Sequence, residues 1–119
     1  MHRRARKRIH VSGIPYYVTV VFRNRKTIFA DPAHCDLFLQ VFEQQRKRYW
    51  FLLHEYVLMP DHYHAILTPP EGFTISDTIR HINGVFALYF NKATHYSGPV
   101  LQARFWDHGI RNDADYNEK

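Results

Sequence analysis

The sequence predicts an α+β fold in which six elements follow the order βαββαβ, and three observations lead to this expectation. Four runs rich in β-branched and aromatic residues have the composition of strands. Two longer segments carry apolar residues at helical spacing, and each lies between strand-like runs. A Pro-Asp corner joins the two middle runs directly, as in a hairpin. This order is the split βαβ arrangement, so we expect one four-stranded antiparallel sheet with two helices on one face and the other face open.

The first half of the chain supplies one strand and one helix. Residues 16–22 read Tyr-Tyr-Val-Thr-Val-Val-Phe, a composition typical of a strand. A helix is expected at residues 32–49, because Asp31 suits an N-cap and Pro32 suits the first helical turn. Its apolar positions recur at helical spacing: Leu37, Phe38, Val41 and Phe42.

The second half supplies a hairpin, a helix and a last strand. Strands are expected at residues 50–58 and 62–68, and the Pro-Pro-Glu-Gly run at 69–72 ends the second of them. The next helix begins at a cap formed by Thr74 or Ser76. Its buried stripe is expected to contain Ile75, Ile79, Ile82, Phe86 and Tyr89, and Gly84 would allow another element to approach closely. A fourth strand is expected at residues 100–110, although its apolar and polar residues alternate imperfectly. Asn112 and Asp113 suit the cap of a third helix, of which the sequence contains only the start.

Length and composition favour one domain covering residues 1–119. The chain has 45% hydrophobic and 23% charged residues, as in globular proteins, and no apolar run long enough to cross a bilayer. Its basic start is not followed by an apolar stretch, so we expect neither a secretory signal nor a membrane partner, and a cytoplasmic location. The single cysteine, Cys35, excludes an internal disulfide and is expected to be a partly buried thiol.

The charge balance points to a phosphate-containing partner. Sixteen Lys and Arg residues against eleven Asp and Glu give a formal net charge of +5. A merely soluble basic surface is the alternative, but the charges are clustered, which favours nucleic acid. Residues 1–12 form a basic arm, and further clusters follow the first strand and close the first helix: Arg3, Arg4, Arg6, Lys7 and Arg8; Arg23, Arg25 and Lys26; Arg46, Lys47 and Arg48.

A His-X-His pair at the start of the third strand is the main candidate site. Because strand side chains alternate, His62 and His64 share one face, while Tyr63 and Ala65 share the other. Two adjacent imidazoles can bind one metal ion, and a solvated or hydrogen-bonded pair is the alternative. Imidazole suits zinc, copper, iron or nickel, whereas magnesium prefers oxygen, so the residues leave the metal open. Another side chain, water or a phosphate oxygen could fill the remaining positions.

Aromatic residues on the strands form a second candidate set. Tyr16, Tyr17, Phe105 and Trp106 either belong to the core or include platforms on which unpaired bases stack. Two-residue spacing would place Arg104, Trp106 and His108 on one strand face. Tyr116 could act as a nucleophile near the open face, or it could simply anchor the start of a helix.

Three blocks of residues resemble one family. Residues 59–67, Met-Pro-Asp-His-Tyr-His-Ala-Ile-Leu, are similar to the His-hydrophobic-His (HUH) motif of the single-tyrosine, IS200-like transposases, especially their REP-associated branch. Residues 13–29 resemble the opening strand and arginine-containing loop of that family, and residues 104–111 resemble its fourth-strand signature. The blocks occur in the family's order and span nearly the whole chain.

The resemblance implies a ferredoxin-like domain, usually a homodimer, that binds hairpin or single-stranded DNA. In the family the two histidines, here His62 and His64, hold Mg2+ or Mn2+, and the metal polarises the scissile phosphate. A tyrosine attacks this phosphate, which leaves a 5′-phosphotyrosine link and a free 3′-hydroxyl. The metal preference implied by the family differs from the one that imidazole chemistry favours. Arg23, Arg25 and Arg104 lie in blocks that resemble the family, and together with the basic arm, which the charge clustering indicates, they are candidate DNA contacts.

The chain departs from the family at its C-terminal end. The family's nucleophilic tyrosine lies after the fourth strand in a Tyr-Ile-X-X-Asn-Pro-like segment, whereas this sequence stops at Lys119. Tyr116 matches an earlier, non-nucleophilic position. We therefore expect the catalytic helix to be largely absent, together with a third metal ligand. Either the sequence is a shortened one, or Tyr116 has taken over the nucleophile's role.

Three functions remain open at this point. The first is metal-assisted cleavage and joining of single-stranded or hairpin DNA by a transposase domain. The second is a catalytically silent nucleic-acid-binding module that uses the basic arm and the sheet aromatics. The third is a zinc hydrolase, which would need another strong ligand near His62 and His64.

Overall fold

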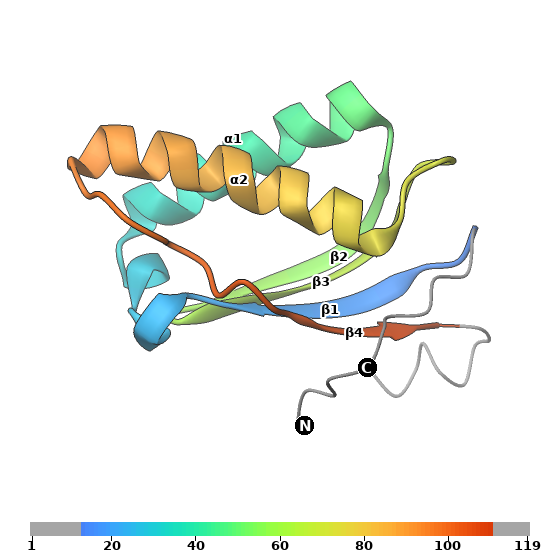
Figure 1. Ribbon diagram of the computed structural model, residues 1–119, viewed down its shortest axis with the longest axis horizontal. Coiled ribbons are helices and arrows are strands. Elements are labelled where there is room, and N and C mark those ends of the chain that lie inside the picture. Colours follow the sequence, from blue (N-terminus) through green and yellow to red (C-terminus); the bar gives the residue numbers. More distant parts are fainter. Residues whose placement is uncertain (1–12, 111–119) are drawn as a thin grey trace.

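A computed structural model describes residues 13–110 and shows the expected two-layer architecture (Figure 1). Strands β1 (Tyr16–Val21), β2 (Leu52–Met59), β3 (His62–Thr68) and β4 (Trp106–Gly109) form one antiparallel sheet in the order β2-β3-β1-β4. Helices α1 (Pro32–Tyr49) and α2 (Ile75–Thr94) both lie on one face of it. The predicted βαββαβ order and the four-stranded antiparallel sheet are thus confirmed. Within residues 13–110 no helix lies on the second face of the sheet, which we call the open face.

Alternation along the two central strands separates the core from the open face. Val18 and Val20 of β1, with Tyr63 and Leu67 of β3, are fully buried beneath the helices. Aromatic side chains of α1 pack on Tyr63, as the 4.6 Å separation of the Phe38 and Tyr63 ring centroids shows. Because Tyr63 is fixed in this core, its neighbours His62 and His64 must point to the opposite face.

The helices begin where the sequence predicts. The side chain of Asp31 accepts a hydrogen bond from the Ala33 amide at the start of α1. At the start of α2, Thr74 and Asp77 form a reciprocal capping box, so Thr74 rather than Ser76 is the cap. The buried stripe of α2 differs in its last member, since Phe90 is buried and Tyr89 is 37% exposed. The stripe therefore continues from Phe86 by four residues to Phe90, and not by three residues to Tyr89.

The sequence also predicts a close approach of another element at Gly84 and partial burial of Cys35, and the structure bears on both. A Cβ added at Gly84 would meet no atom within 4 Å, so the expected close approach of another element is wrong. Cys35 is partly buried, as expected, and its thiol donates to the carbonyl of Phe29. Within residues 13–110, neither helix is long and apolar enough to cross a membrane.

The two outer strands differ from their predicted limits. β2 starts at Leu52 rather than at residue 50, because Trp50 adopts a left-handed conformation (φ 60°) that ends α1. The expected strand at 100–110 is shortened to Trp106–Gly109. An isolated bridge joins Leu101 to Phe22, but regular pairing resumes only at Trp106 and Thr19, so four residues of this segment face two of β1. These extra residues bend the chain away from the sheet.

Candidate metal and DNA site

The imidazoles of His62 and His64 converge on the open face of the sheet. Their Nε2 atoms lie 3.1 Å apart, and their ring planes are 82° to one another. Both residues are partly exposed, in contrast to Tyr63 between them. The pair therefore presents two ring nitrogens to one point above the sheet, as the sequence predicts.

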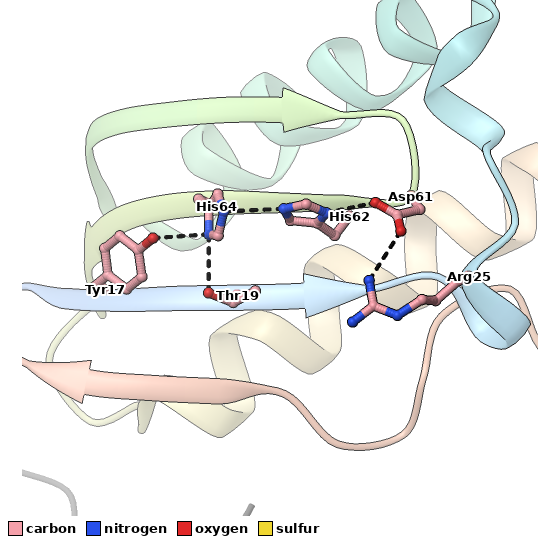
Figure 2. A network of polar contacts seen from close by, with 6 residues as sticks. All are labelled: Tyr17, Thr19, Arg25, Asp61, His62 and His64. Atoms are coloured by element: carbon pink, nitrogen blue, oxygen red, sulfur yellow. Dashed lines mark hydrogen bonds and ion pairs between the residues drawn. The ribbon is translucent and has the colours of Figure 1, made fainter. Parts of the chain in front are cut away.

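Asp61 orients the His62 ring through a hydrogen bond, and Arg25 in turn binds Asp61. Asp61 accepts a hydrogen bond from Nδ1 of His62 at 2.7 Å, and its second oxygen accepts one from Arg25 at 3.0 Å (Figure 2). A proton on Nδ1 leaves the lone pair on Nε2, the nitrogen that faces His64. The hydrogen bond from His62, followed by that from Arg25, lowers the pKa of Asp61 and keeps it ionised.

Two hydroxyl groups of β1 hold His64. The hydroxyl oxygens of Tyr17 and Thr19 each lie 3.0 Å from Nδ1 of His64, and Thr19 is its direct cross-strand partner. A hydroxyl can donate or accept, so Nδ1 keeps a partner whether or not it carries a proton. His64 can therefore change tautomer without losing its orientation.

The donor set fits a divalent cation whose remaining ligands are oxygens. With Nδ1 protonated on both rings, two lone pairs face one another at 3.1 Å, an unfavourable contact that a cation between them would relieve. Across residues 13–110, no cluster of three His, Cys, Asp or Glu side chains could hold a metal. The third ligand that a zinc hydrolase needs is not found there, and water and phosphate could complete the shell.

Burial favours the neutral form of His64. Partial desolvation, and then the neighbouring charge of His62, lowers the pKa of the His64 imidazole. A neutral ring is the form that can bind a metal, so burial favours the metal-binding form of this imidazole.

The basic candidates among residues 13–110 lie in two different settings. Arg23 and Arg25 form a short 3-10 turn directly after β1, where the Phe22 amide bonds to the carbonyl of Asp61. Asn24 and Arg25 have positive φ angles of 59° and 51°, uncommon for residues other than glycine, and this turn brings Arg25 back to Asp61. Arg104 is exposed and precedes β4, so it lies outside the strand whose alternation was expected to place it beside Trp106, and its place on that face stays a prediction.

Other expected site residues lie outside the described part of the chain. These are the basic arm (Arg3, Arg4, Arg6, Lys7 and Arg8) and Tyr116.

The aromatic candidates divide between the two faces. Tyr16 and Phe105 are buried core residues, at 2% and 7% exposure. Tyr17 pairs with His108, and Thr19 pairs with Trp106, so all four share the open face with His64. The Tyr17 ring stacks on that of His64 with a centroid separation of 5.4 Å. Tyr17 and Trp106 thus lie on the open face, and base stacking on their rings stays a prediction.

The supporting residues of the site are the part that sequence reasoning missed. Nothing in the sequence gives the register that sets Thr19 opposite His64. Asp61 could have been found, because a carboxylate directly before a His-X-His pair is a natural partner for imidazole.

Comparison with known proteins identifies the family. Residues 10–111 match the sequence profile of the family described as transposase IS200 like. The REP-associated tyrosine transposase of Escherichia coli (strain K12) is 33% identical over 113 residues, covering 92% of this chain and 64% of that protein. This chain therefore spans less than two thirds of the length of that relative.

Solved structures agree with the fold. The structure of a REP-associated tyrosine transposase bound to a REP hairpin has a TM-score of 0.79 at 27% identity, covering 98% of this chain and 67% of that chain. A crystal structure of a candidate transposase from Deinococcus radiodurans has a TM-score of 0.70 at 16% identity, covering 97% and 92%, and shows the fold alone. On the profile match over most of its length, and with the paired histidines in place, this chain belongs to the IS200-like transposase family.

Proposed function

We propose that this chain binds single-stranded or hairpin DNA on the open face of its sheet and acts in metal-assisted cleavage and joining of DNA strands. The observation that carries the proposal is the convergence of the His62 and His64 Nε2 atoms, 3.1 Å apart, on that face. A similar protein, the REP-associated tyrosine transposase, has been solved with a REP hairpin bound. Its likeness to this chain supports a DNA hairpin as the partner.

The DNA-binding surface consists of basic and aromatic residues around this pair. Arg23 and Arg25 follow β1, and Arg25 is paired with Asp61. Tyr17 and Trp106 lie on the open face itself. Cations bind phosphates irrespective of sequence, and aromatic rings stack on unpaired bases. We add to this surface the exposed Arg104 and the basic arm: Arg3, Arg4, Arg6, Lys7 and Arg8.

His62 and His64 would hold a Mg2+ or Mn2+ ion. IS200-like transposases use a divalent metal. Two nitrogen ligands leave most of the coordination shell to water and phosphate oxygens, which these two ions prefer. When bound, the ion supplies Lewis-acid polarisation of the scissile phosphate. Asp61 fixes His62, and the hydroxyls of β1 fix His64, so that both Nε2 atoms face the phosphate site.

Strand cleavage follows the family's chemistry. A tyrosine hydroxyl oxygen forms a bond to phosphorus and loses its proton, the bond from phosphorus to O3′ breaks, and the 3′-oxygen leaves as a hydroxyl. The product is a 5′-phosphotyrosine link. The resemblance assigns the nucleophile to a segment after β4 and not to Tyr116, so residues 13–110 are assigned phosphate binding and positioning.

A covalent-capture experiment tests the enzymatic part. The protein is incubated with 3′-end-labelled single-stranded hairpin DNA and Mn2+, because the 3′ fragment is the one that stays linked to the tyrosine, and the products are separated on a denaturing gel. The transposase function predicts a labelled adduct that disappears in the H62A/H64A variant. Binding without an adduct would rule out cleavage by this chain and leave the second candidate, a DNA-binding module. Absence of binding by the unmodified protein would refute both.

We also propose a homodimer joined along β2. This strand is one edge of the sheet, and it exposes Leu52 and Met59, at 60% and 41%. Exposed apolar edges pair readily with another strand. Sedimentation velocity should show a concentration-dependent dimer that is lost in L52K. A monomer at every concentration would contradict the proposed pairing.

A further inference from the structure

Trp50, between α1 and β2, is the most exposed large apolar residue of the described chain, residues 13–110. It is 82% exposed, whereas the next, Leu52, is 60% exposed. A tryptophan so exposed adds almost nothing to the hydrophobic core. Exposed aromatic rings of this kind are enriched where a protein binds a partner. Trp50 is therefore a candidate contact residue rather than a structural one.

The backbone of Trp50 supports the same conclusion. Its φ and ψ angles of 60° and 34° are left-handed, and its amide donates to the carbonyl of Arg46 to end α1. Helices usually place glycine at this position, because a side chain there is strained. Folding alone would favour glycine over tryptophan, so the fold does not account for the indole.

The last turn of α1 surrounds Trp50 with positive charge. Arg46 and Lys47 both contact the carboxylate of Glu43. Arg48 is exposed, lies 5.6 Å from the centre of the Tyr49 ring, and forms no ion pair within residues 13–110. Three cations against one carboxylate leave this surface positive, and a positive surface is complementary to phosphate. A ring flanked by cations suits an unpaired, stacked nucleotide strand.

This surface lies at the end of the sheet opposite to the start of β3. Leu52, two residues after Trp50, pairs with Thr68 at the end of β3, whereas His62 begins that strand. Six residue steps of about 3.3 Å separate Thr68 from His62, roughly 20 Å in all. At about 3.4 Å per nucleotide this distance corresponds to about six nucleotides. Single-strand sites cover roughly 4–16 nucleotides, so one strand can span both places.

We propose that Trp50 and the cations of the last α1 turn form a second contact for single-stranded DNA, distant from the histidine pair. An unpaired base stacks on the indole, and Arg48 binds a neighbouring phosphate. The inference rests on the proposed function, since it takes the same DNA as ligand. Every base has a face that can stack, so this contact lengthens the binding site without adding a sequence preference.

Two DNA probes separate this contact from the histidine site. One is a bare hairpin, and the other is the same hairpin extended by about ten thymidines at each end. Both carry a fluorescent label, and binding is followed by anisotropy in the presence of Mg2+. W50G should bind the extended hairpin about tenfold more weakly than the wild type does, and the bare hairpin equally well. Its melting temperature should not fall, because glycine suits the left-handed conformation.

Matched variants complete the affinity test. W50F keeps an aromatic ring and should retain most of the affinity for the extended hairpin. L88A removes an exposed apolar side chain from α2 and should bind as the wild type does. Wild-type affinity of W50G for the extended hairpin, or an equal loss on both probes, would overturn the proposal. A W50G protein that binds DNA normally but no longer dimerises would assign Trp50 to contact with a second copy instead.

Tryptophan fluorescence provides the direct readout. The chain contains two tryptophans, Trp50 and Trp106, so Trp50 is the single emitter in W106F. Stacking of a base should quench its emission over the concentrations at which the extended hairpin binds, and the bare hairpin should leave it unchanged. Binding of the extended hairpin without quenching would contradict the contact. Failure of the wild type to bind either probe would refute the proposed function rather than this contact alone.

Discussion

The Nε2 atoms of His62 and His64 lie 3.1 Å apart on the open face of the sheet, and each ring is anchored through its Nδ1 atom. If one Nε2 atom carries a proton, the other accepts it in a hydrogen bond; if both Nδ1 atoms carry the proton, two lone pairs face one another. In the first case metal binding displaces the Nε2 proton and its hydrogen bond. The displaced proton can move to Nδ1 of the same ring only where the group bonded to that Nδ1 accepts a hydrogen bond: Asp61 for His62, and Tyr17 or Thr19 for His64.

Replacement of both histidines should remove metal binding and spare the fold. In H62A/H64A the side chains lost are partly exposed and lie opposite the core, so the unfolding free energy should fall by about 1 kcal/mol or less. Mn2+ binding, measured by electron paramagnetic resonance, should disappear. A large loss of thermal stability would place these residues in the core and contradict the assignment.

The residue between them should behave in the opposite way. The buried Tyr63 hydroxyl donates to Asn83 at 2.7 Å, and Y63F would leave that amide oxygen without its partner. The expected cost is about 1–3 kcal/mol of unfolding free energy, with Mn2+ affinity unchanged. Urea denaturation measures the first quantity. A Y63F protein with normal stability but weakened Mn2+ binding would reverse the two roles.

Asp61 should control the affinity of the pair for metal. D61A removes the acceptor that keeps the proton on Nδ1 of His62, so Mn2+ affinity should fall roughly 10- to 100-fold. D61N keeps an acceptor oxygen and should retain most of the affinity. Nitrogen NMR of His62 provides the independent readout, because D61A alone should shift its tautomer. Equal metal affinity in D61A and the wild type would show that the hydrogen bond has no influence.

Arg25 should contribute one phosphate contact to DNA binding. R25Q should weaken binding about equally for different DNA sequences and reduce the salt slope by about one unit. R80Q, on α2 and paired with Asp77, is the control that should leave the slope unchanged. The measurement is DNA affinity at several salt concentrations. An unchanged slope in R25Q would remove this residue from the interface.

The thiol of Cys35 should react slowly with alkylating reagents. Burial, and then the charges of Asp36 and Asp31, raises the pKa of this thiol in the folded protein. The thiolate is the reactive form, so native protein at pH 8 should react with iodoacetamide more slowly than urea-unfolded protein. The raised pKa also stabilises the fold below the unfolded-state pKa, and this contribution is lost as the pH rises through the folded-state value. Equal alkylation rates would contradict the burial.

The sequence by itself determined the order of elements and the side of the sheet on which the histidines lie. Local signals suffice for this: β-branched runs, the Asp31 cap, and the Thr74 and Asp77 capping box act within a few residues of chain. Strand alternation then fixes His62 and His64 on one face, because Tyr63 between them must be buried. These properties depend on short sequence separations, and the sequence contains them directly.

Tertiary structure decided which residues surround the pair. Strand register sets Thr19 opposite His64, and the positive φ angles after β1 return Arg25 to Asp61, across 45 and 36 positions of the chain. The same packing shortened β4 to Trp106–Gly109, because four residues of the preceding segment face two of β1 and bend outward. Register and bulges arise from packing over the whole sheet, so no local sequence pattern specifies them.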